Sequence, residues 1–367
     1  MKLNRVIISG GGTGGHIFPA VAIADEIKRR NPDAAILFIG AKGKMEMEKV
    51  PQAGYQIVGL PIAGFQRRLT FSNFILPFKL VWSLLLAAKV IRGFKPQLVI
   101  GVGGYASGPT LQMAQLLGYA TLIQEQNSYP GKTNQLLAKR CQKICVAYEH
   151  MERFFPADKV VLTGNPVRSF VQLKEANLRQ EAAAFFGLDS SKKTILVIGG
   201  SLGARTLNSS MANGYKQLAQ AGYQLLWQCG KSYEPNIAEF GELPAEIKVT
   251  AFIQRMDYAY ALADVIVSRA GAISVSELAL VSKPVILVPS PNVAEDHQTK
   301  NAMALVEKGA ALLVRDTEAP ELLVKQVLEL ATNPSAQSEL ASALVRFAKP
   351  TACAQIVDTC EQLIVRV

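Results

Sequence analysis

The chain has 367 residues, is 49% hydrophobic and carries a formal net charge of +10. This length predicts about two domains, and the hydrophobic content excludes a mainly disordered chain. The surplus charge lies in the first part, because residues 1–165 hold 20 basic and 9 acidic side chains while residues 166–367 are near neutral. No apolar run reaches the ~20 residues of a membrane-spanning helix, since Lys79, Lys89 and Arg92 interrupt the longest candidate.

Short apolar runs bounded by Gly or Pro alternate with helical periodicity through the first half. Such runs are typical of parallel strands that are covered on both faces. We expect strands at residues 5–9, 35–39, 55–60, 98–102 and 121–123, with a helix at 18–30.

The second half repeats this alternation. The expected strands are residues 194–198, 224–227, 249–252, 265–267 and 285–288. The expected helices are residues 205–221, 298–308 and 352–367.

Both halves place glycines directly after a buried strand and before a helix. GGGTGGH (residues 10–16) matches GGSLGAR (199–205), and GVGGYASGP (101–109) weakly matches SRAGAISVSE (268–277). These pairs predict an α/β protein of two Rossmann-like domains facing a deep cleft. GNPVR (164–168) interrupts the pattern with Gly and Pro and marks the expected boundary.

A glycine-rich turn before a helix N-terminus is suited to an anion, because backbone N–H groups and the helix dipole face it. The first turn carries more glycines than the GxGxxG dinucleotide motif needs, it is not a P-loop, and no acidic residue suited to a ribose follows the second strand. No DxD sequence is present to hold a diphosphate through a metal, so we expect no metal and no cofactor. Helix dipoles, backbone N–H groups and Arg168 or Arg269 would then neutralise a diphosphate.

Two side chains beside these turns are candidates for chemistry. His16 opens a helix next to the glycines, where it is either a cap or a base, and we favour a functional role because the chain has only three histidines. Glu277 lies in the first turns of a helix, where its carboxylate either accepts ribose hydroxyls or complements the helix dipole.

Seven motifs in order resemble the MurG family of bacterial peptidoglycan N-acetylglucosaminyltransferases. They span nearly the whole chain, and their sequences are GGTGGH (11–16), GGYASGP (103–109), EQN (125–127), GNPVR (164–168), GGSLGAR (199–205), GAISVSE (271–277) and DHQTKNA (296–302). The family's frequent His-Glu-Gln-Asn reads Gln124-Glu125-Gln126-Asn127 here, which argues against an essential histidine at 124.

The resemblance implies the GT-B glycosyltransferase fold. Residues 1–165 would bind acceptor and membrane, residues 166–345 would bind the UDP-sugar donor, and residues 346–367 would form a helix crossing back to the first domain. The implied reaction moves N-acetylglucosamine, with inversion, from UDP-N-acetylglucosamine to the 4-hydroxyl of lipid I, the undecaprenyl-diphospho-muramoyl-pentapeptide acceptor, giving lipid II. The implied location is the cytoplasmic face of the bacterial inner membrane, with other cell-wall synthesis proteins as partners.

The resemblance also implies roles for individual residues. The base that takes the proton of the acceptor hydroxyl would be His16 first and Glu125 second. The residues implied to bind substrate are Thr13, Gly14, Gly15, Asn127, Arg168, Ser201, Ile253, Ala272, Ile273, Ser274, Val275, Ser276, Glu277 and Gln298. Among these, Ile253 would lie by the uracil, Glu277 on the ribose and Gln298 on sugar hydroxyls.

A segment around residues 69–86 combines large apolar and basic side chains. We expect part of it to be core and part to rest on anionic lipid. The residues expected to form this membrane patch are Arg67, Arg68, Ile75, Phe78, Lys79 and Trp82.

Three other functions compete with the transferase. A UDP-N-acetylglucosamine 2-epimerase shares the architecture but needs no lipid, which the basic apolar segment disfavours. A membrane-associated scaffold could bind the nucleotide sugar without turning it over. A nucleic-acid partner would fit the charge alone, but aliphatic runs interrupt the basic stretch and no RNA or DNA motif is present.

Overall fold

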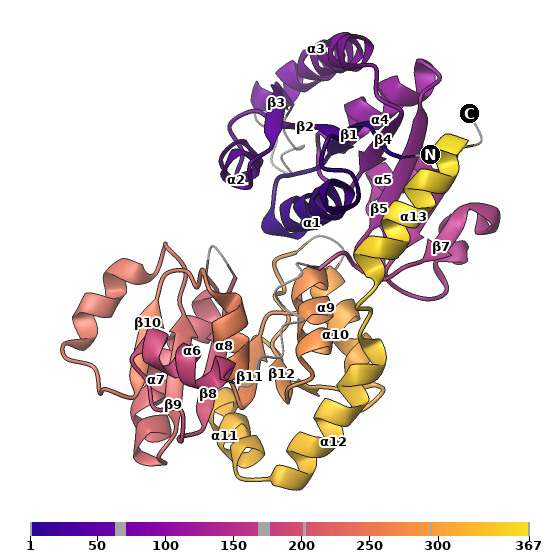
Figure 1. Cartoon of the computed structure of the whole chain (residues 1–367). Helices are drawn as coiled ribbons and strands as arrows, with labels where there is room; N and C mark the ends of the chain where they lie inside the picture. Colours follow the sequence, from indigo (N-terminus) through magenta and orange to yellow (C-terminus); the bar gives the residue numbers. More distant parts are fainter. Residues whose placement is uncertain (1, 63–70, 168–176, 201–202, 294–295, 366–367) are drawn as a thin grey trace. The chain divides into compact units, whose positions relative to one another are not determined.

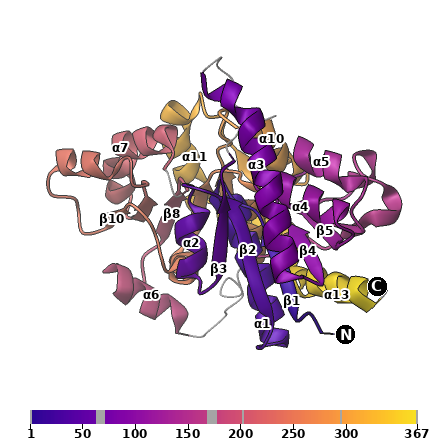
Figure 2. The ribbon, with the colours of Figure 1, turned by 90° about the horizontal axis from the view of Figure 1, so that it is seen from above.

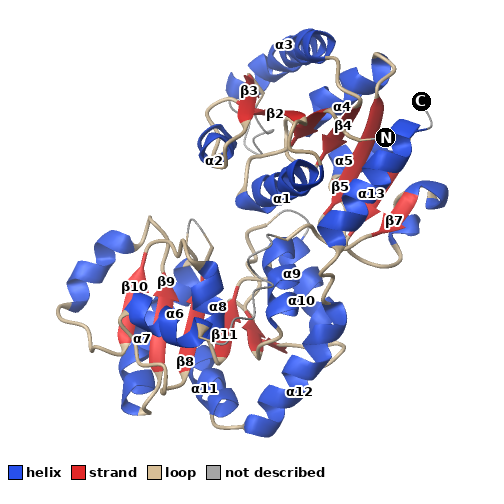
Figure 3. Ribbon diagram, viewed as in Figure 1, coloured by secondary structure: helices blue, strands red, loops and turns tan. Residues whose placement is uncertain are grey.

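The structure, a computed structural model, describes residues 2–62, 71–167, 177–200, 203–293 and 296–365, with only the backbone for residues 71–76, 235 and 365. The chain divides into two compact units (Figure 1). Unit 1 comprises Met1–Arg168 and Lys349–Val367, and unit 2 comprises Ser169–Ala348. Each unit is a parallel sheet covered by helices (Figure 3), which confirms the predicted α/β class with two Rossmann-like domains.

The described residues of unit 1 form a seven-stranded parallel sheet. In spatial order its strands are β3 (Gln56–Leu60), β2 (Ala35–Ala41), β1 (Arg5–Ser9), β4 (Leu98–Gly101), β5 (Ala120–Glu125), β6 (Lys143–Val146) and β7 (Val160–Leu162). The order changes direction between β1 and β4, because β2 and β3 lie on one side of β1 and the later strands on the other.

Helices cover both faces of this sheet. One face packs against α1 (Gly14–Arg30), α2 (Glu46–Gln52) and α13 (Ala352–Val365). The other face packs against α3 (Phe71–Phe94), α4 (Ser107–Leu116) and α5 (Lys132–Ala138), and Figure 2 shows α3 as a long helix along this unit. The last helix is tied to the first, because Arg30 pairs with Asp358 at 2.6 Å and with Glu361 at 3.1 Å.

The described part of unit 2 forms a six-stranded parallel sheet. In spatial order its strands are β10 (Ile247–Thr250), β9 (Gln224–Gln228), β8 (Thr194–Ile198), β11 (Val265–Ser268), β12 (Val285–Leu287) and β13 (Leu312–Leu313). Its helices are α6 (Leu178–Phe186), α7 (Arg205–Gln220), α8 (Met256–Leu262), α9 (Ala272–Val281), α10 (His297–Val306), α11 (Ala319–Ala331) and α12 (Pro334–Leu344). Trp227 fills the core beneath α7.

The position of one strand differs from the prediction. The apolar run predicted a strand at residues 249–252, whereas β10 begins at Ile247 and ends at Thr250. Pairing with β9 sets this register, and Lys248 is tolerated because β10 lies at the edge of the sheet. Phe252 therefore belongs to the loop that follows the strand.

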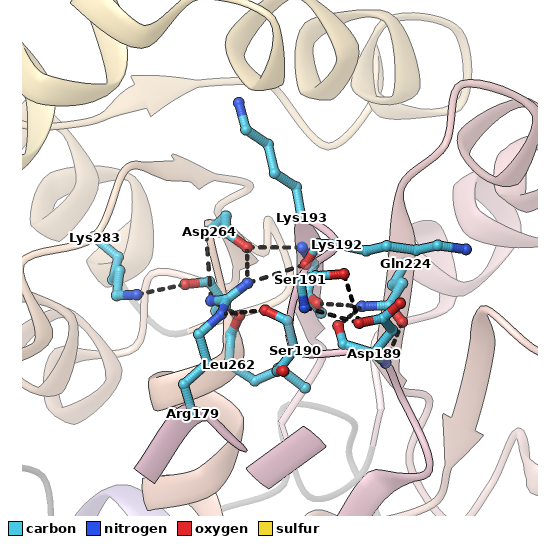
Figure 4. A network of polar contacts seen from close by, with 12 residues as sticks. Arg179, Asp189, Ser190, Ser191, Lys192, Lys193, Gln224, Leu262, Asp264 and Lys283 are labelled. Atoms are coloured by element: carbon cyan, nitrogen blue, oxygen red, sulfur yellow. Dashed lines mark hydrogen bonds and ion pairs between the residues drawn. The ribbon is translucent and has the colours of Figure 1, made fainter. Parts of the chain in front are cut away.

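A polar network holds α6 and the loop after it to the amino ends of the strands in unit 2 (Figure 4). Arg179 donates to the carbonyls of Ser190, Leu262 and Lys192 and pairs with Asp264 at 2.9 Å. Asp264 also accepts from the Thr194 N–H at 2.8 Å. Lys283, whose pKa is lowered by burial, donates to the Ala263 carbonyl. This cluster lies at the opposite end of the strands from the glycine-rich turns.

Among the helices within the described ranges, none is long and apolar enough to cross a membrane.

Candidate active site

The glycine-rich turns lie where the strand order of each sheet changes direction. In unit 1 the turns after β1 and β4 flank this switch point, and in unit 2 it lies between β8 and β11. Ligands of open parallel sheets bind at such points, beyond the carboxyl ends of the strands. The topology therefore assigns one candidate ligand site to each unit, at the motifs that the sequence indicated.

The two turns of unit 1 pack closely against each other. A Cβ on Gly104 would lie 2.2 Å from the Gly11 carbonyl oxygen, and one on Gly10 would lie 2.2 Å from Val102 Cγ2. Gly11 and Gly104 also have positive φ angles of +151° and +86°, which L side chains rarely adopt. These glycines allow the turns to approach closely and leave the start of α1 at the switch point.

His16 lies in the first turn of α1, directly over the second glycine turn. A Cβ on Gly103 would lie 2.7 Å from His16 Cδ2 and 2.9 Å from its Nε2. On the other side of the ring, His16 Nδ1 is 3.0 Å from the Gly11 carbonyl oxygen and 3.4 Å from Thr13 Oγ1. The backbone of both turns therefore fixes the position of the imidazole.

Glu46 holds the first glycine-rich turn of unit 1 through backbone hydrogen bonds. Its side chain comes from α2 and is fully buried. Its carboxylate accepts the Gly12 N–H at 2.8 Å and the Ala41 N–H at 2.9 Å. This carboxylate connects the turn after β1 to the end of β2.

Glu125, the other candidate base, ends β5 and is 2% exposed. One of its oxygens accepts the Asn127 N–H at 3.0 Å and Asn127 Nδ2 at 3.2 Å. The other accepts from Asn134 Nδ2 at 2.8 Å and from the Gly131 N–H at 3.2 Å. Burial raises the pKa of this carboxyl group, and the N–H donors oppose that rise. Its visible role is to fold the loop between β5 and α5.

Side-chain amides connect three loops at the carboxyl ends of the strands in unit 1. Gln126 Nε2 donates to the Val102 carbonyl at 2.8 Å and to Gln124 Oε1, while Gln124 Nε2 donates to Asn165 Oδ1 at 3.0 Å. Asn165 Nδ2 returns to the Gln126 carbonyl at 3.0 Å. Gln124, at the position where the MurG family frequently has histidine, is thus a buried part of a neutral network.

In unit 2, residues 272–277 form the first turns of α9 after Gly271. Ala272, Ile273 and Val275 are buried, while Ser276 Oγ donates to the Ala272 carbonyl at 3.1 Å. The Glu277 carboxylate is 6% exposed and accepts from Tyr260 Oη at 3.0 Å. Tyr260 therefore orients the carboxylate that the sequence assigned to a ribose.

Two more predicted donor contacts flank this sheet. Ile253 is buried, and its backbone N–H donates to Gln228 Oε1 at 3.1 Å. This N–H is therefore bonded within the protein and does not point toward a uracil. Gln298, in the first turn of α10, accepts the Ser290 N–H on its Oε1 at 2.9 Å. This bond uses the amide oxygen of Gln298, whereas its Nε2 group can only donate.

Arg269 neutralises a protein carboxylate. Its guanidinium pairs with Asp316 and donates to the carbonyls of Val288 and Pro289. Asp316 also accepts from Thr206 Oγ1 at 2.8 Å. Arg269 therefore joins the loops after β11, β12 and β13 and is already engaged.

Family models and curated proteins match nearly the whole chain. The glycosyltransferase family 28 N-terminal domain matches residues 6–146, and the family 28 C-terminal domain matches residues 194–356. A Cytophaga hutchinsonii protein is 56% identical over 99% of this chain and 98% of its own length. That relative is named UDP-N-acetylglucosamine–N-acetylmuramyl-(pentapeptide) pyrophosphoryl-undecaprenol N-acetylglucosamine transferase.

The chain belongs to glycosyltransferase family 28. It is therefore a glycosyltransferase, and the two matched regions fall in the two sheets described above.

Solved structures agree with this family and with the GT-B fold. Acinetobacter baumannii MurG superposes with a TM-score of 0.76, at 29% identity, over 98% of this chain and 99% of that one. A UDP-N-acetylglucosamine 2-epimerase superposes with a TM-score of 0.66, but at 13% identity, over 96% of this chain and 95% of that one. The epimerase shares the fold alone, so identity to family 28 transferases decides against the epimerase reading.

Some predicted site residues of this family 28 chain lie outside the described residues. They are Arg67, Arg68, Arg168 and Ser201, together with the side chain of Ile75. Of the predicted substrate residues in unit 1, Thr13, Gly14 and Gly15 lie at the start of α1 beside His16, and Asn127 lies on the loop that Glu125 organises. No cluster of three or more His, Cys, Asp or Glu side chains that could hold a metal is present in the described part of the chain.

Sequence reasoning missed two carboxylates near the sites, Glu46 and Asp316. Each meets partners far away in the sequence, Gly12 in one case and Thr206 with Arg269 in the other. Neither carboxylate belongs to a glycine-rich motif. A search of the sequence for glycine-rich motifs would therefore not find either carboxylate.

Proposed function

We propose that this chain transfers N-acetylglucosamine from UDP-N-acetylglucosamine to the 4-hydroxyl of undecaprenyl-diphospho-N-acetylmuramoyl-pentapeptide, the step that makes lipid II. The observation that carries this function is the 56% identity, over nearly the full length of both chains, to a transferase named for this reaction. The glycine-rich turns at both switch points supply the sites that such a reaction needs.

Residues 1–165 are proposed to bind the acceptor and residues 166–345 the donor, with residues 346–367 returning to the first domain. In the donor part, Glu277 accepts the ribose hydroxyls and Gln298 contacts the sugar. The N-terminus of α9, a ten-residue helix, faces the diphosphate with its N–H groups. Arg168 and Ser201 are the additional candidates for the diphosphate. Arg269 is not assigned this role, since Asp316 already neutralises it.

In the transfer, the acceptor O4 attacks the anomeric carbon while the bond from that carbon to the UDP phosphate oxygen breaks. The electron pair of that bond leaves with UDP, and attack from the opposite face inverts the anomeric carbon. The hydroxyl proton must pass to a base. We assign the base to His16, because Glu125 is buried and both its oxygens accept N–H donors of its own loop, whereas a neutral imidazole has one nitrogen that can take a proton.

The acceptor and the location follow from the proposed function and from α3. Phe78, Val81, Trp82 and Leu85 are all exposed and, at spacings i, i+3, i+4 and i+7, lie on one face of this helix. Lys79 is exposed beside them, while Ala87 and Ile91 on the other side enter the core. An apolar stripe with basic neighbours is suited to an anionic lipid surface. We infer that the protein acts peripherally on the cytoplasmic face of the inner membrane, in cell-wall growth and division.

The test is turnover by the full chain with a soluble lipid I analogue and radiolabelled UDP-N-acetylglucosamine. Wild-type protein should give the disaccharide product. His16→Ala should lower kcat roughly 100- to 10,000-fold, the usual contribution of general base catalysis, and should still bind the donor. The control is His150→Asn, which replaces an exposed histidine of positive φ with a residue that tolerates this conformation.

One result would contradict this function, and another would contradict the assignment of the base. Conversion of UDP-N-acetylglucosamine to its 2-epimer without any acceptor would favour the epimerase. Turnover of the His16→Ala variant at the wild-type rate would remove His16 from the mechanism.

A further inference from the structure

One peptide group in unit 1 connects two side chains that are 30 residues apart in the sequence. This group consists of the Gly11 carbonyl and the Gly12 N–H. The N–H donates to Glu46 Oε2 at 2.8 Å, and the carbonyl oxygen is 3.0 Å from His16 Nδ1. A trans peptide is planar, with its N–H and C=O pointing in opposite directions, so fixing one end fixes the other.

The chemistry of this chain sets the direction of each hydrogen bond. A carbonyl oxygen can only accept, so the proton between His16 and Gly11 must reside on Nδ1. A neutral imidazole that carries its proton on Nδ1 has its lone pair on Nε2. The Nε2 edge is the one that lies against Gly103 at the switch point.

Glu46 strengthens this arrangement. Its carboxylate polarises the peptide through the Gly12 N–H, and hydrogen bonds in a chain strengthen one another in a buried environment. The Gly11 carbonyl consequently becomes a better acceptor for His16 Nδ1. The order of groups is carboxylate, peptide and imidazole.

We propose that Glu46 is a positioning residue for the transfer reaction, holding His16 through the Gly11–Gly12 peptide in the tautomer whose Nε2 can take a proton. The proposal rests on the proposed function, in which His16 is the base. Glu46 itself is not among the residues proposed to bind either substrate.

The surroundings of Glu46 are shaped around its carboxylate. A Cβ on Gly11 would lie 2.2 Å from Glu46 Cδ and Oε1, and one on Gly40 would lie 2.5 Å from Glu46 Cγ. The Ala41 N–H holds the second carboxylate oxygen at 2.9 Å. The side chain therefore has one position, with one oxygen aimed at the turn.

A purely structural role for Glu46 would stabilise the turn without setting the tautomer. Nitrogen NMR of protein labelled with ¹⁵N-histidine separates these roles, because the two ring nitrogens report the tautomer directly. The chain has three histidines, and His16 is assigned by the signals that the His16→Ala variant loses. We expect wild-type neutral His16 to be the Nδ1–H tautomer.

The variant is Glu46→Gln, whose amide has one acceptor oxygen and cannot accept from both Gly12 and Ala41. We expect its Nδ1–H population to fall and kcat to drop roughly 10- to 100-fold, by analogy with the hydrogen-bond partners that orient metal-binding histidines. KM for UDP-N-acetylglucosamine should change less than kcat, because most of the residues proposed to bind the nucleotide belong to unit 2. Glu46→Leu, of similar length and with no acceptor, should have the larger effect.

The matched control is Glu48→Gln, the same change two residues along α2 at an exposed carboxylate. It should leave the tautomer and kcat unchanged. An Nε2–H tautomer in the wild-type spectrum would overturn the proposal. This test needs no Glu46 variant, so the proposal can be rejected even if every Glu46 variant misfolds.

The outcomes also separate this proposal from the proposed function. Wild-type kcat and tautomer in Glu46→Gln and Glu46→Leu, with His16→Ala inactive, would reject the role of Glu46 and keep the base. An active His16→Ala variant would reject the base, and the catalytic role of Glu46 with it, even if the spectrum shows the Nδ1–H tautomer.

Discussion

Gly103 is the residue against which the His16 ring lies. A Cβ at this position would come within 2.7 Å of His16 Cδ2, and the backbone there has a φ of +93°. Both facts require glycine, but only the first concerns the imidazole. The sequence marked this position as part of a glycine-rich turn without indicating which side chain it faces.

We expect Gly103→Ala to displace the imidazole and to lower kcat about 100-fold, since small misplacements of a catalytic group are costly. Gly118→Ala is the control, because Gly118 has a similar φ of +80° with nothing within 4 Å of the added Cβ. Turnover with the lipid I analogue, measured beside thermal unfolding, checks this expectation. Equal kcat values for the two variants would show that backbone strain, rather than crowding of His16, causes any loss.

Some site residues lie together in a short sequence motif, and others meet only in the folded chain. Thr13, Gly14, Gly15 and His16 belong to one glycine-rich motif, and the structure places them together at the start of α1. The support from Glu46 could not be predicted, because that contact depends on how α2 packs against β2 and β3. Local patterns reveal a turn, whereas the carboxylate that orients it is found only in three dimensions.

The strands were the most predictable elements. Buried parallel strands are continuous apolar runs, and the prediction of residues 5–9 and 194–198 coincides with β1 and β8. The short edge strands β7 and β13 have three and two residues, too few for a pattern to indicate them. Pairing with a neighbour, rather than composition, defines such strands.

The polar network around Arg179 connects α6 to the sheet of unit 2, and a substitution of Arg179 tests its contribution to stability (Figure 4). Arg179 donates to three carbonyls and one carboxylate, and lysine can replace only part of this set. We expect Arg179→Lys to lower the free energy of unfolding of unit 2 by about 1 kcal/mol, because partly buried acceptors would lose their donors.

Urea unfolding followed by Trp227 fluorescence measures this effect. The chain has two tryptophans, so a Trp82→Phe background leaves Trp227, in the core of unit 2, as the reporter. Arg315→Lys is the control, since Arg315 forms an exposed ion pair with Glu318, which should contribute little. An Arg179 variant as stable as the control would show that other contacts hold α6.

At the scale of the whole molecule, the charge and the apolar stripe occur in the same part of the chain. Residues 1–165 carry +11, and the segment from Lys49 to Leu122, which includes α3, has no acidic residue. The sequence predicted an amphipathic patch here but could not separate its buried side from its exposed side. The structure makes this division, since Ala87 and Ile91 are buried while Phe78 and Trp82 are 77% and 65% exposed.

The exposed stripe leads to a prediction about membrane binding. Each large apolar side chain that enters the interface contributes about 1–2 kcal/mol, and basic neighbours add an attraction that only anionic lipid supplies. We expect Phe78→Glu with Trp82→Glu to weaken binding to anionic vesicles at least about tenfold. Wild-type protein should bind these vesicles more tightly than zwitterionic ones, and added salt should weaken that binding.

Vesicle flotation of the full chain measures this binding, with circular dichroism to confirm that each variant is folded. Leu136→Glu is the control, because Leu136 is an equally exposed apolar residue, at 76%, on α5 of the same unit. A general effect of replacing an exposed apolar residue by a carboxylate would also weaken flotation of the control. Wild-type flotation of the Phe78→Glu, Trp82→Glu variant would show that the stripe on α3 does not contact lipid. The excess charge of residues 1–165 would then need another anionic partner, of which the diphosphate of the acceptor is the first candidate.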